Sequence, residues 1–261
     1  MPLSPECPDG ISLLPIPGIP MVEPGADLIA AIASAADAAG LAVIDGDILA
    51  IAQKIVSKAE GRYVTLDTVM PSPRALTLAA ETGKDARLVE IILSESQSVL
   101  RHRPGVLIVV HRLGLVLANA GVDASNVDSA DGRERVLLLP VDPDASAARL
   151  RAGAKARWGR EVGVVVTDSP GRAWRHGSVN IAIGAAGLPA LLDLRGKPDL
   201  FGRALRATTV GHADQIAAAA GLLQGQADEG RPVVIVRGLT ATGANGTAAD
   251  LIRDATEDLF R

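Results

Sequence analysis

Short apolar runs and alanine-rich segments follow one another along this 261-residue chain without a regular strand–helix repeat. The apolar spacing predicts helices over 27–39 and 145–159 and buried strands over 48–56 and 162–166. Two further apolar runs flank His111-Arg112 and predict a hairpin. Because hairpins and helices are mixed instead of alternating strictly, the pattern favours an α+β fold with mixed sheets and two subdomains over a doubly wound sheet.

The remaining predicted elements complete this mixture of helices and strands. They are helices over 74–82, 86–98, 214–223 and 248–259, a strand over 233–236, and a glycine- and alanine-rich stretch over 181–192 that can pack closely against backbone. The run over 48–56 is expected to carry Ser57 and Lys58 at the end of a strand.

The side chains available for the core are unusual. The chain has two Trp, one Tyr and two Phe, so Ala, Val, Leu and Ile must fill the interior. This scarcity argues against a stacking platform for single-stranded nucleic acid, which needs several exposed rings. One cysteine, Cys7, excludes an internal disulfide and a zinc site built from thiolates.

Charge is unevenly distributed. The formal net charge is −4, which disfavours a general nucleic-acid binder. Residues 149–206 carry eleven Lys or Arg against four Asp or Glu, so this segment is +7 and the remainder is −11. A basic segment in an acidic protein suggests a small anionic ligand; a solvated basic face is the alternative.

The first ten residues have no basic start followed by an apolar stretch, and no apolar run reaches membrane-spanning length. The sequence therefore predicts a cytoplasmic protein without a membrane partner. Familiar nucleotide-binding and hydrolase motifs are also missing: there is no P-loop, no dinucleotide-binding glycine pattern after a strand, and no nucleophile elbow. The four histidines lack the spacing of zinc ligands.

Two aspartates each follow an apolar run and sit among small polar residues. Asp123 has Ser125 and Asn126 beside it, and Asp168 has Thr167 and Ser169 as neighbours. Such oxygen ligands suit Mg²⁺ or Mn²⁺, which hold phosphates with one or two carboxylates and several waters. Turn capping is the alternative for each aspartate taken alone, but their joint occurrence supports metal and phosphate chemistry.

Basic and aromatic residues near these loops are candidate ligand contacts. Lys58 could complement phosphate charge, although a surface lysine is the alternative. Arg172 and Arg175 could clamp a carboxylate or phosphate, and Trp174 between them could stack on a ligand ring or serve packing.

Seven short blocks stand out along the chain: Gly18-Ile-Pro-Met-Val, Asp45-Gly-Asp-Ile-Leu, Ser57-Lys-Ala-Glu-Gly, Asn119-Ala-Gly-Val-Asp-Ala-Ser-Asn, Leu137-Leu-Leu-Pro, Thr167-Asp-Ser-Pro-Gly-Arg-Ala-Trp-Arg and Phe201-Gly-Arg-Ala-Leu. They occur in the order and approximate spacing found in coenzyme F-420 gamma-glutamyl ligases, and over about residues 15–239 the chain resembles that family. The Lys-Ala-Glu-Gly and Asn-Ala-Gly-Val-Asp-Ala-Ser-Asn blocks are the most specific of them.

The resemblance implies a GTP-dependent amide ligase that adds L-glutamate to the deazaflavin precursor F-420-0 and can extend a gamma-linked tail. It further implies Mg²⁺ or Mn²⁺, assistance by K⁺, a homodimer, and a family-specific fold with two subdomains around a cleft. Residues 1–104 with 207–261 would form the nucleotide side, and 105–206 the metal and acceptor side.

The family's site residues carry over by position. Asp123, Asp168, Ser169 and Gln226 match metal positions, and Arg172, Trp174 and Arg175 would face the acceptor or glutamate. The nucleotide positions are Ile19, Pro20, Met21, Val22, Gln53, Lys54, Lys58, Asn126, Gln224, Gly225 and Gln226. Asp123, Asp168 and Lys58 are the expected catalytic residues.

Three departures from the family pattern affect the acceptor and the metal. Gln53-Lys54 replaces a Ser-Thr type pair, Gln226 stands at a late acidic metal position, and Asp214-Gln215 replaces Asp-Glu. An amide brings no charge, so loss of a carboxylate at 226 would weaken a second metal site. A ligase acting on a different carboxylate, or a nucleotide- or deazaflavin-binding protein without catalysis, are the alternative functions.

Overall fold

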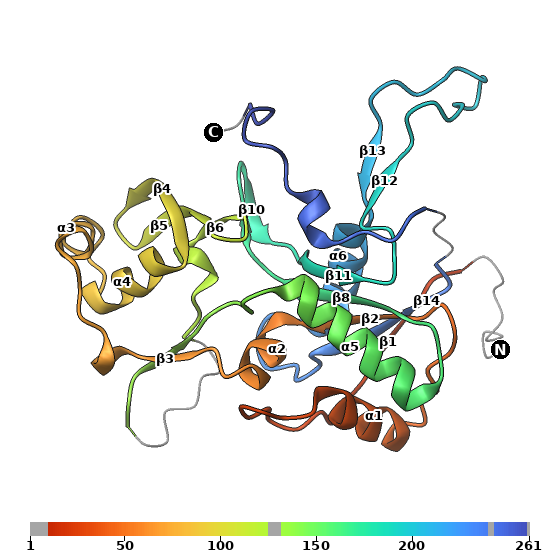
Figure 1. The fold of residues 1–261 in the computed structure, drawn as a ribbon, viewed down its shortest axis with the longest axis horizontal. Helices are drawn as coiled ribbons and strands as arrows, with labels where there is room; N and C mark the ends of the chain where they lie inside the picture. Colours follow the sequence, from red (N-terminus) through yellow and green to blue (C-terminus); the bar gives the residue numbers. More distant parts are fainter. Residues whose placement is uncertain (1–9, 125–131, 240–242, 260–261) are drawn as a thin grey trace.

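The computed structural model describes residues 10–124, 132–239 and 243–259 (Figure 1). A five-stranded sheet lies at its centre, in the order β1-β14-β2-β8-β11. These strands are β1 (Ser12–Pro15), β14 (Val233–Arg237), β2 (Ile48–Ala52), β8 (Gly163–Asp168) and β11 (Ile181–Ala186). β2 and β8 run parallel, whereas every other neighbouring pair is antiparallel. The mixed sheet with helices confirms the α+β class.

Helices cover both faces of this sheet (Figure 1). Helices α1 (Leu28–Ala38) and α5 (Pro143–Trp158) lie on one face, and α6 (His212–Gln224) lies on the other. Side chains of β2 alternate between the two layers: Leu49 and Ile51 join the first cluster, while Ile48 and Ala50 join the second. The buried residues of both clusters are Ala, Val, Leu and Ile, as the aromatic scarcity predicts.

A second group of elements, here called the small lobe, lies in sequence between strands β2 and β8 of the central sheet. It consists of α3 (Pro73–Thr82), α4 (Ala86–Ser94), β4 (Ser96–Arg103), β5 (Val106–His111) and β6 (Val116–Ala118). The strands form an antiparallel sheet β4-β5-β6, so the predicted hairpin is confirmed. The lobe has its own apolar cluster and joins the rest of the chain through the ribbon of β3 (Tyr63–Thr65) and β7 (Arg135–Leu137).

An ionic cluster fastens the small lobe to the remainder. Glu95, at the end of α4, accepts from Arg62 Nη2 at 3.0 Å and from Arg112 Nε at 3.0 Å, with His111 Nε2 at 3.5 Å. Arg62 also donates to Leu139 O, and Arg112 donates to Val141 O, both near the start of α5. The carboxylate therefore ties three segments from different parts of the chain together.

Two hairpins extend from the central sheet. The short strands β9 (Gly171–Arg172) and β10 (Arg175–Ser178) follow β8 directly. The pair β12 (Leu191–Asp193) and β13 (Thr209–Gly211) supports a long arm, which projects from the body in Figure 1. Leu200 and Phe201 are almost fully exposed on this arm.

Three predicted boundaries are wrong. The strand beginning at Ile48 ends at Ala52, because its neighbour β14 is preceded by Pro232, and residues 53–59 form helix α2 (Gln53–Ala59). Lys58 is therefore on a helix, not at the end of a strand. The helix predicted over 86–98 ends at Ser94, where β4 begins one residue later.

The closing helix predicted over 248–259 is the third error. A single turn of 3₁₀ helix, η3 (Ala248–Leu251), forms there, with a capping box between Thr247 and Asp250. Beyond Ile252 the segment is polar and largely exposed, so a longer helix would have no apolar face to bury against the rest of the protein. Within the described ranges, no helix has the length and apolar character needed to span a membrane.

Candidate active site

The candidate site lies at the carboxyl edge of the parallel pair β2 and β8. Ala52 is opposite Thr167 in the ladder, so Gln53 and Asp168 leave the sheet at the same edge. Parallel strands place the residues that follow them on one side of a sheet, which is where α/β proteins commonly bind ligands. Two segments far apart in sequence therefore meet here.

A cavity of about 260 Å³ opens at this edge. It brings together every described residue of the predicted nucleotide set: Ile19, Pro20, Met21, Val22, Gln53, Lys54, Lys58, Gln224, Gly225 and Gln226. Asp168 and Ser169 line it too. Asn126, the remaining predicted contact, lies outside the described residues.

Asp168 and Asp123 interact across this site. Burial raises the pKa of Asp168, and the nearby charge of Asp123 raises it further. The Ser169 backbone N–H, the Lys54 ammonium and a side-chain hydrogen bond from Gln53 act in the opposite direction. The pKa of Asp168 remains above its ordinary value, because burial and the charge of Asp123 together outweigh these three interactions.

Asp123 is held by the backbone of the connecting ribbon. Its N–H donates to Leu137 O at 3.0 Å, and the Leu137 N–H donates to Asp123 O at 2.8 Å. The carboxylate reaches toward α2, where its Oδ2 lies 2.7 Å from Lys54 Nζ. Asp123, Asp168 and Lys54 thus form one charged cluster, although they come from three separate segments.

The side chain of Gln224 serves the scaffold of the cavity. Its Oε1 accepts from Thr167 Oγ1 at 3.1 Å and from Asn180 Nδ2 at 2.7 Å, while its Nε2 donates to Ala50 O and Pro232 O, each at 3.2 Å. A buried amide with these partners positions the strands around it.

Gln226 and Asn180 extend the same network. Gln226 Nε2 donates to Asn180 Oδ1 at 2.9 Å, which leaves the carbonyl oxygen of Gln226 as the atom suited to a cation. No local pattern in the sequence indicates Asn180, because its amide bonds to Gln224 and Gln226, which lie 44 and 46 positions further along the chain. Glu229 and Arg231, which also line the cavity, were missed for the same lack of a local pattern.

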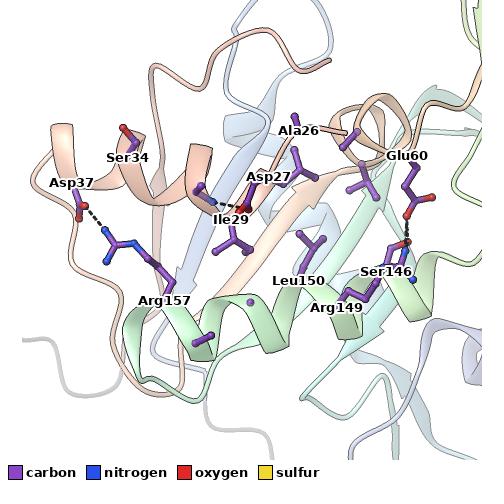
Figure 2. Close-up of a pocket in the computed structure, with 16 residues that line it drawn as sticks. Ala26, Asp27, Ile29, Ser34, Asp37, Glu60, Ser146, Arg149, Leu150 and Arg157 are labelled. Carbon is purple, nitrogen blue, oxygen red and sulfur yellow. Dashed lines mark hydrogen bonds and ion pairs between the residues drawn. The ribbon is translucent and has the colours of Figure 1, made fainter. Parts of the chain in front are cut away.

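Lys58 and its neighbour Glu60 face different surfaces. Lys58 is 5% exposed and lines the cavity. Glu60 turns toward α5, where its Oε1 accepts from Ser146 Oγ and from Arg149 Nη2, the latter at 2.7 Å (Figure 2). In the Lys-Ala-Glu-Gly block, the lysine therefore belongs to the site and the glutamate anchors α2 to α5.

The groove beside Glu60 is larger, at about 840 Å³, and runs between α1 and α5 (Figure 2). Two of its acidic side chains pair with arginines of α5: Arg157 Nη2 lies 2.9 Å from Asp37 Oδ2, and Arg149 pairs with Glu60. Its apolar lining includes Leu28, Ile29, Val56 and Leu150. This groove is larger, but the residues that line it do not include the converging carboxylates and lysines of the smaller cavity.

The three predicted acceptor contacts do not line the cavity. They lie on the β9–β10 hairpin, which continues from Asp168. Arg172 donates to Gly177 O at 3.2 Å and to His176 O at 3.0 Å, so its guanidinium braces the hairpin instead of forming a clamp with Arg175. Trp174 is 80% exposed, with a left-handed φ of 58°.

The donor set fits a hard divalent cation. Carboxylate oxygens of Asp123 and Asp168, the hydroxyl of Ser169 and the amide oxygen of Gln226 are the ligand types that Mg²⁺ and Mn²⁺ accept, with phosphates and waters completing the shell. The described part of the chain contains no group of three or more His, Cys, Asp or Glu arranged for a metal.

Known proteins resemble this chain over nearly its whole length. Residues 18–238 match the family model described as F420-0:Gamma-glutamyl ligase. A protein of Methanothermobacter thermautotrophicus named coenzyme F420:L-glutamate ligase is 45% identical over 254 residues, covering 97% of this chain and 99% of its own. Proteins with the same name from Methanopyrus kandleri and Archaeoglobus fulgidus are 46% and 41% identical, with coverage of 97% and 96% of this chain and 99% and 96% of theirs. The chain belongs to the F420-0:gamma-glutamyl ligase family.

Proposed function

We propose that this protein joins L-glutamate to the deazaflavin precursor F420-0 through an amide bond, using GTP, and that it can extend a gamma-linked tail. The names of relatives that share 41–46% identity over nearly the whole chain support the glutamate ligase activity. The observation that carries the proposal is the cavity at the edge of β2 and β8, where the described nucleotide positions meet Asp168.

Amide formation requires an activated carboxylate, because a carboxylate anion is a poor electrophile at neutral pH. In the proposed reaction, the acceptor carboxylate attacks the γ-phosphorus of GTP, the bond to the β-phosphate oxygen breaks, and GDP leaves. The amine of glutamate then attacks the acyl phosphate, loses a proton and expels inorganic phosphate. These steps require no nucleophile from the protein.

The site residues would act mainly by placing and neutralising charge. Asp123, Asp168, Ser169 and Gln226 would hold Mg²⁺ or Mn²⁺, and the ion would supply positive charge to the phosphates. Lys58, buried on the cavity wall, would contact phosphate oxygens. The segment over 19–22, Gln53 and the turn at 224–226 would surround the nucleotide, and K⁺ would assist by adding charge.

The acceptor would approach from the β9–β10 hairpin. Trp174 and Arg175 are exposed there, next to the end of β8 that carries Asp168. An indole ring is suited to stacking on a deazaflavin, and a guanidinium is suited to a phosphodiester or to glutamate carboxylates.

The direct test combines the purified protein with F420-0, L-glutamate, GTP and Mn²⁺, followed by mass spectrometry of the deazaflavin and measurement of GDP. The expected result is a glutamyl adduct formed together with GDP. Asp168→Asn should lower the rate by about 100-fold or more, since it replaces a charged metal ligand by a neutral amide and so weakens the cation that would neutralise the phosphates. Asp37→Asn, in the groove between α1 and α5, is the matched control.

The other outcomes separate the alternatives. Phosphate release only with a different carboxylate would show that F420-0 is the wrong acceptor. Tight binding of GTP or F420-0 without GDP formation would show a binding protein. Full activity of Asp168→Asn would refute the metal assignment.

A further inference from the structure

Lys54, one of the predicted nucleotide contacts, also pairs with a carboxylate that the proposed chemistry assigns to a metal ion. Its ammonium lies 2.7 Å from Asp123 Oδ2 and also acts on the charge of Asp168. The side chain lines the cavity, so the same ammonium faces the space where phosphates would lie. One cation is therefore within reach of both carboxylates and of the nucleotide position.

The charge at this edge of the sheet explains why a cation is needed before any ligand binds. The charges of Asp123 and Asp168 act on each other here. Solvent is limited at this point, since the side chains of Lys54 and Asp123 are only 27% and 30% exposed. Like charges in such surroundings repel strongly unless a counter-ion lies between them. Lys54 supplies that counter-ion from the protein itself.

A divalent ion would need the same Asp123 oxygen. An ammonium donates hydrogen bonds to the lone pairs of a carboxylate oxygen, and a metal ion is bound by the same lone pairs. The ammonium and the metal ion therefore compete for that oxygen. The flexible four-carbon stem of lysine lets the ammonium move without moving the backbone. A phosphate group in the cavity would offer the displaced ammonium a new partner.

We propose that Lys54 is the resident counter-ion of Asp123 and Asp168, and that its transfer from Asp123 to a nucleotide phosphate couples divalent-metal binding to nucleotide binding. The competition rests on the metal assignment of the proposed function, and the coupling rests on its use of GTP as well. Coupling is reciprocal: nucleotide tightens metal binding by the same factor as metal tightens nucleotide binding.

The test is Mn²⁺ binding, measured from the electron paramagnetic resonance signal of free Mn²⁺, first without nucleotide. Lys54→Met keeps the length of the side chain and removes its charge. It should bind Mn²⁺ roughly three- to tenfold more tightly than the wild type, the range expected for loss of one partly exposed ion pair. Lys54→Arg should retain weak binding, because it keeps a cation.

Lys155→Met is the matched control, since Lys155 pairs with Glu161 on the surface of the α5 region. Its Mn²⁺ affinity should equal that of the wild type. Equal affinity of the wild type and Lys54→Met would overturn the proposal while leaving the ligase function intact. Absence of Mn²⁺ binding in every variant would overturn the proposal and the metal assignment together.

The second measurement adds GTP in the absence of acceptor. In the wild type, GTP should tighten Mn²⁺ binding; in Lys54→Met, the enhancement should be several-fold smaller. An equal enhancement in both proteins would refute the transfer to phosphate. If GTP had no effect on either protein while Lys54→Met still bound Mn²⁺ more tightly, the counter-ion role would stand, and the transfer to phosphate and the proposed use of GTP would both fail.

Discussion

Replacing Glu95 by glutamine tests the ionic cluster that fastens the small lobe. Burial by itself raises the pKa of this carboxyl, but hydrogen bonds from His111 and Arg112 and the charge of Arg62 lower it from 4.5 to about 2. A carboxyl group whose pKa is lower in the folded state stabilises that state fully at pH values above its unfolded-state pKa. The stabilisation is lost as the pH falls toward the folded-state pKa. The lowered pKa of Glu95 corresponds to a contribution to the free energy of unfolding of about 3 kcal/mol at pH 7 and of about 2 kcal/mol near pH 3.5.

Urea unfolding of the wild type and Glu95→Gln at these two pH values measures the effect. The variant should be less stable by about 3 kcal/mol at pH 7, and the gap should narrow by about 1 kcal/mol near pH 3.5, where the wild type loses part of its advantage. Glu134→Gln, which removes an exposed partner of Arg87, should change the free energy of unfolding by about 0.5 kcal/mol or less. A Glu95→Gln variant as stable as the wild type at pH 7, or a gap that does not depend on pH, would refute the reasoning.

Three further substitutions address packing, the acceptor and assembly. At Gly184, a Cβ would lie 2.2 Å from Pro143 O, so Gly184→Ala should lose about 2 kcal/mol or more in thermal unfolding; Gly171→Ala, with nothing within 4 Å, should not. Trp174→Ala should leave stability unchanged and weaken F420-0 binding by roughly five- to tenfold in a fluorescence titration, and unchanged affinity would remove Trp174 from the acceptor site. We also propose a homodimer in which the exposed arm contacts the second copy: Phe201→Asp should lower the mass measured by light scattering toward that of a monomer, and an unchanged mass would exclude this contact.

Local patterns predicted individual elements and the residues at their ends. Asp168 was recognisable because a carboxylate directly follows a short valine-rich run, and such a run needs burial on both faces. The helix over 53–59 was not recognisable, because an apolar run continues across Ala52 and only the neighbouring strand determines where pairing stops.

The connections between segments required the folded structure. No spacing in the sequence indicates that Lys54 pairs with Asp123, or that the amide of Gln224 links Thr167 to Asn180. In the same way, Arg172 is a residue type that suits a clamp for an anionic ligand, yet its guanidinium donates to backbone carbonyls a few residues away. Backbone groups close in sequence can satisfy the hydrogen bonds of a polar side chain in place of a ligand.

The parallel pairing of β2 with β8 has a consequence for how this site forms during folding. Ala52 and Thr167 are opposite each other although more than about a hundred residues separate them, so the ladder closes a long loop and forms slowly compared with local helices. Lys54 and Asp168 meet only after that closure. If the site binds Mn²⁺ as proposed, recovery of that binding during refolding should mark the time at which these two segments have joined, later than the signal from helix formation.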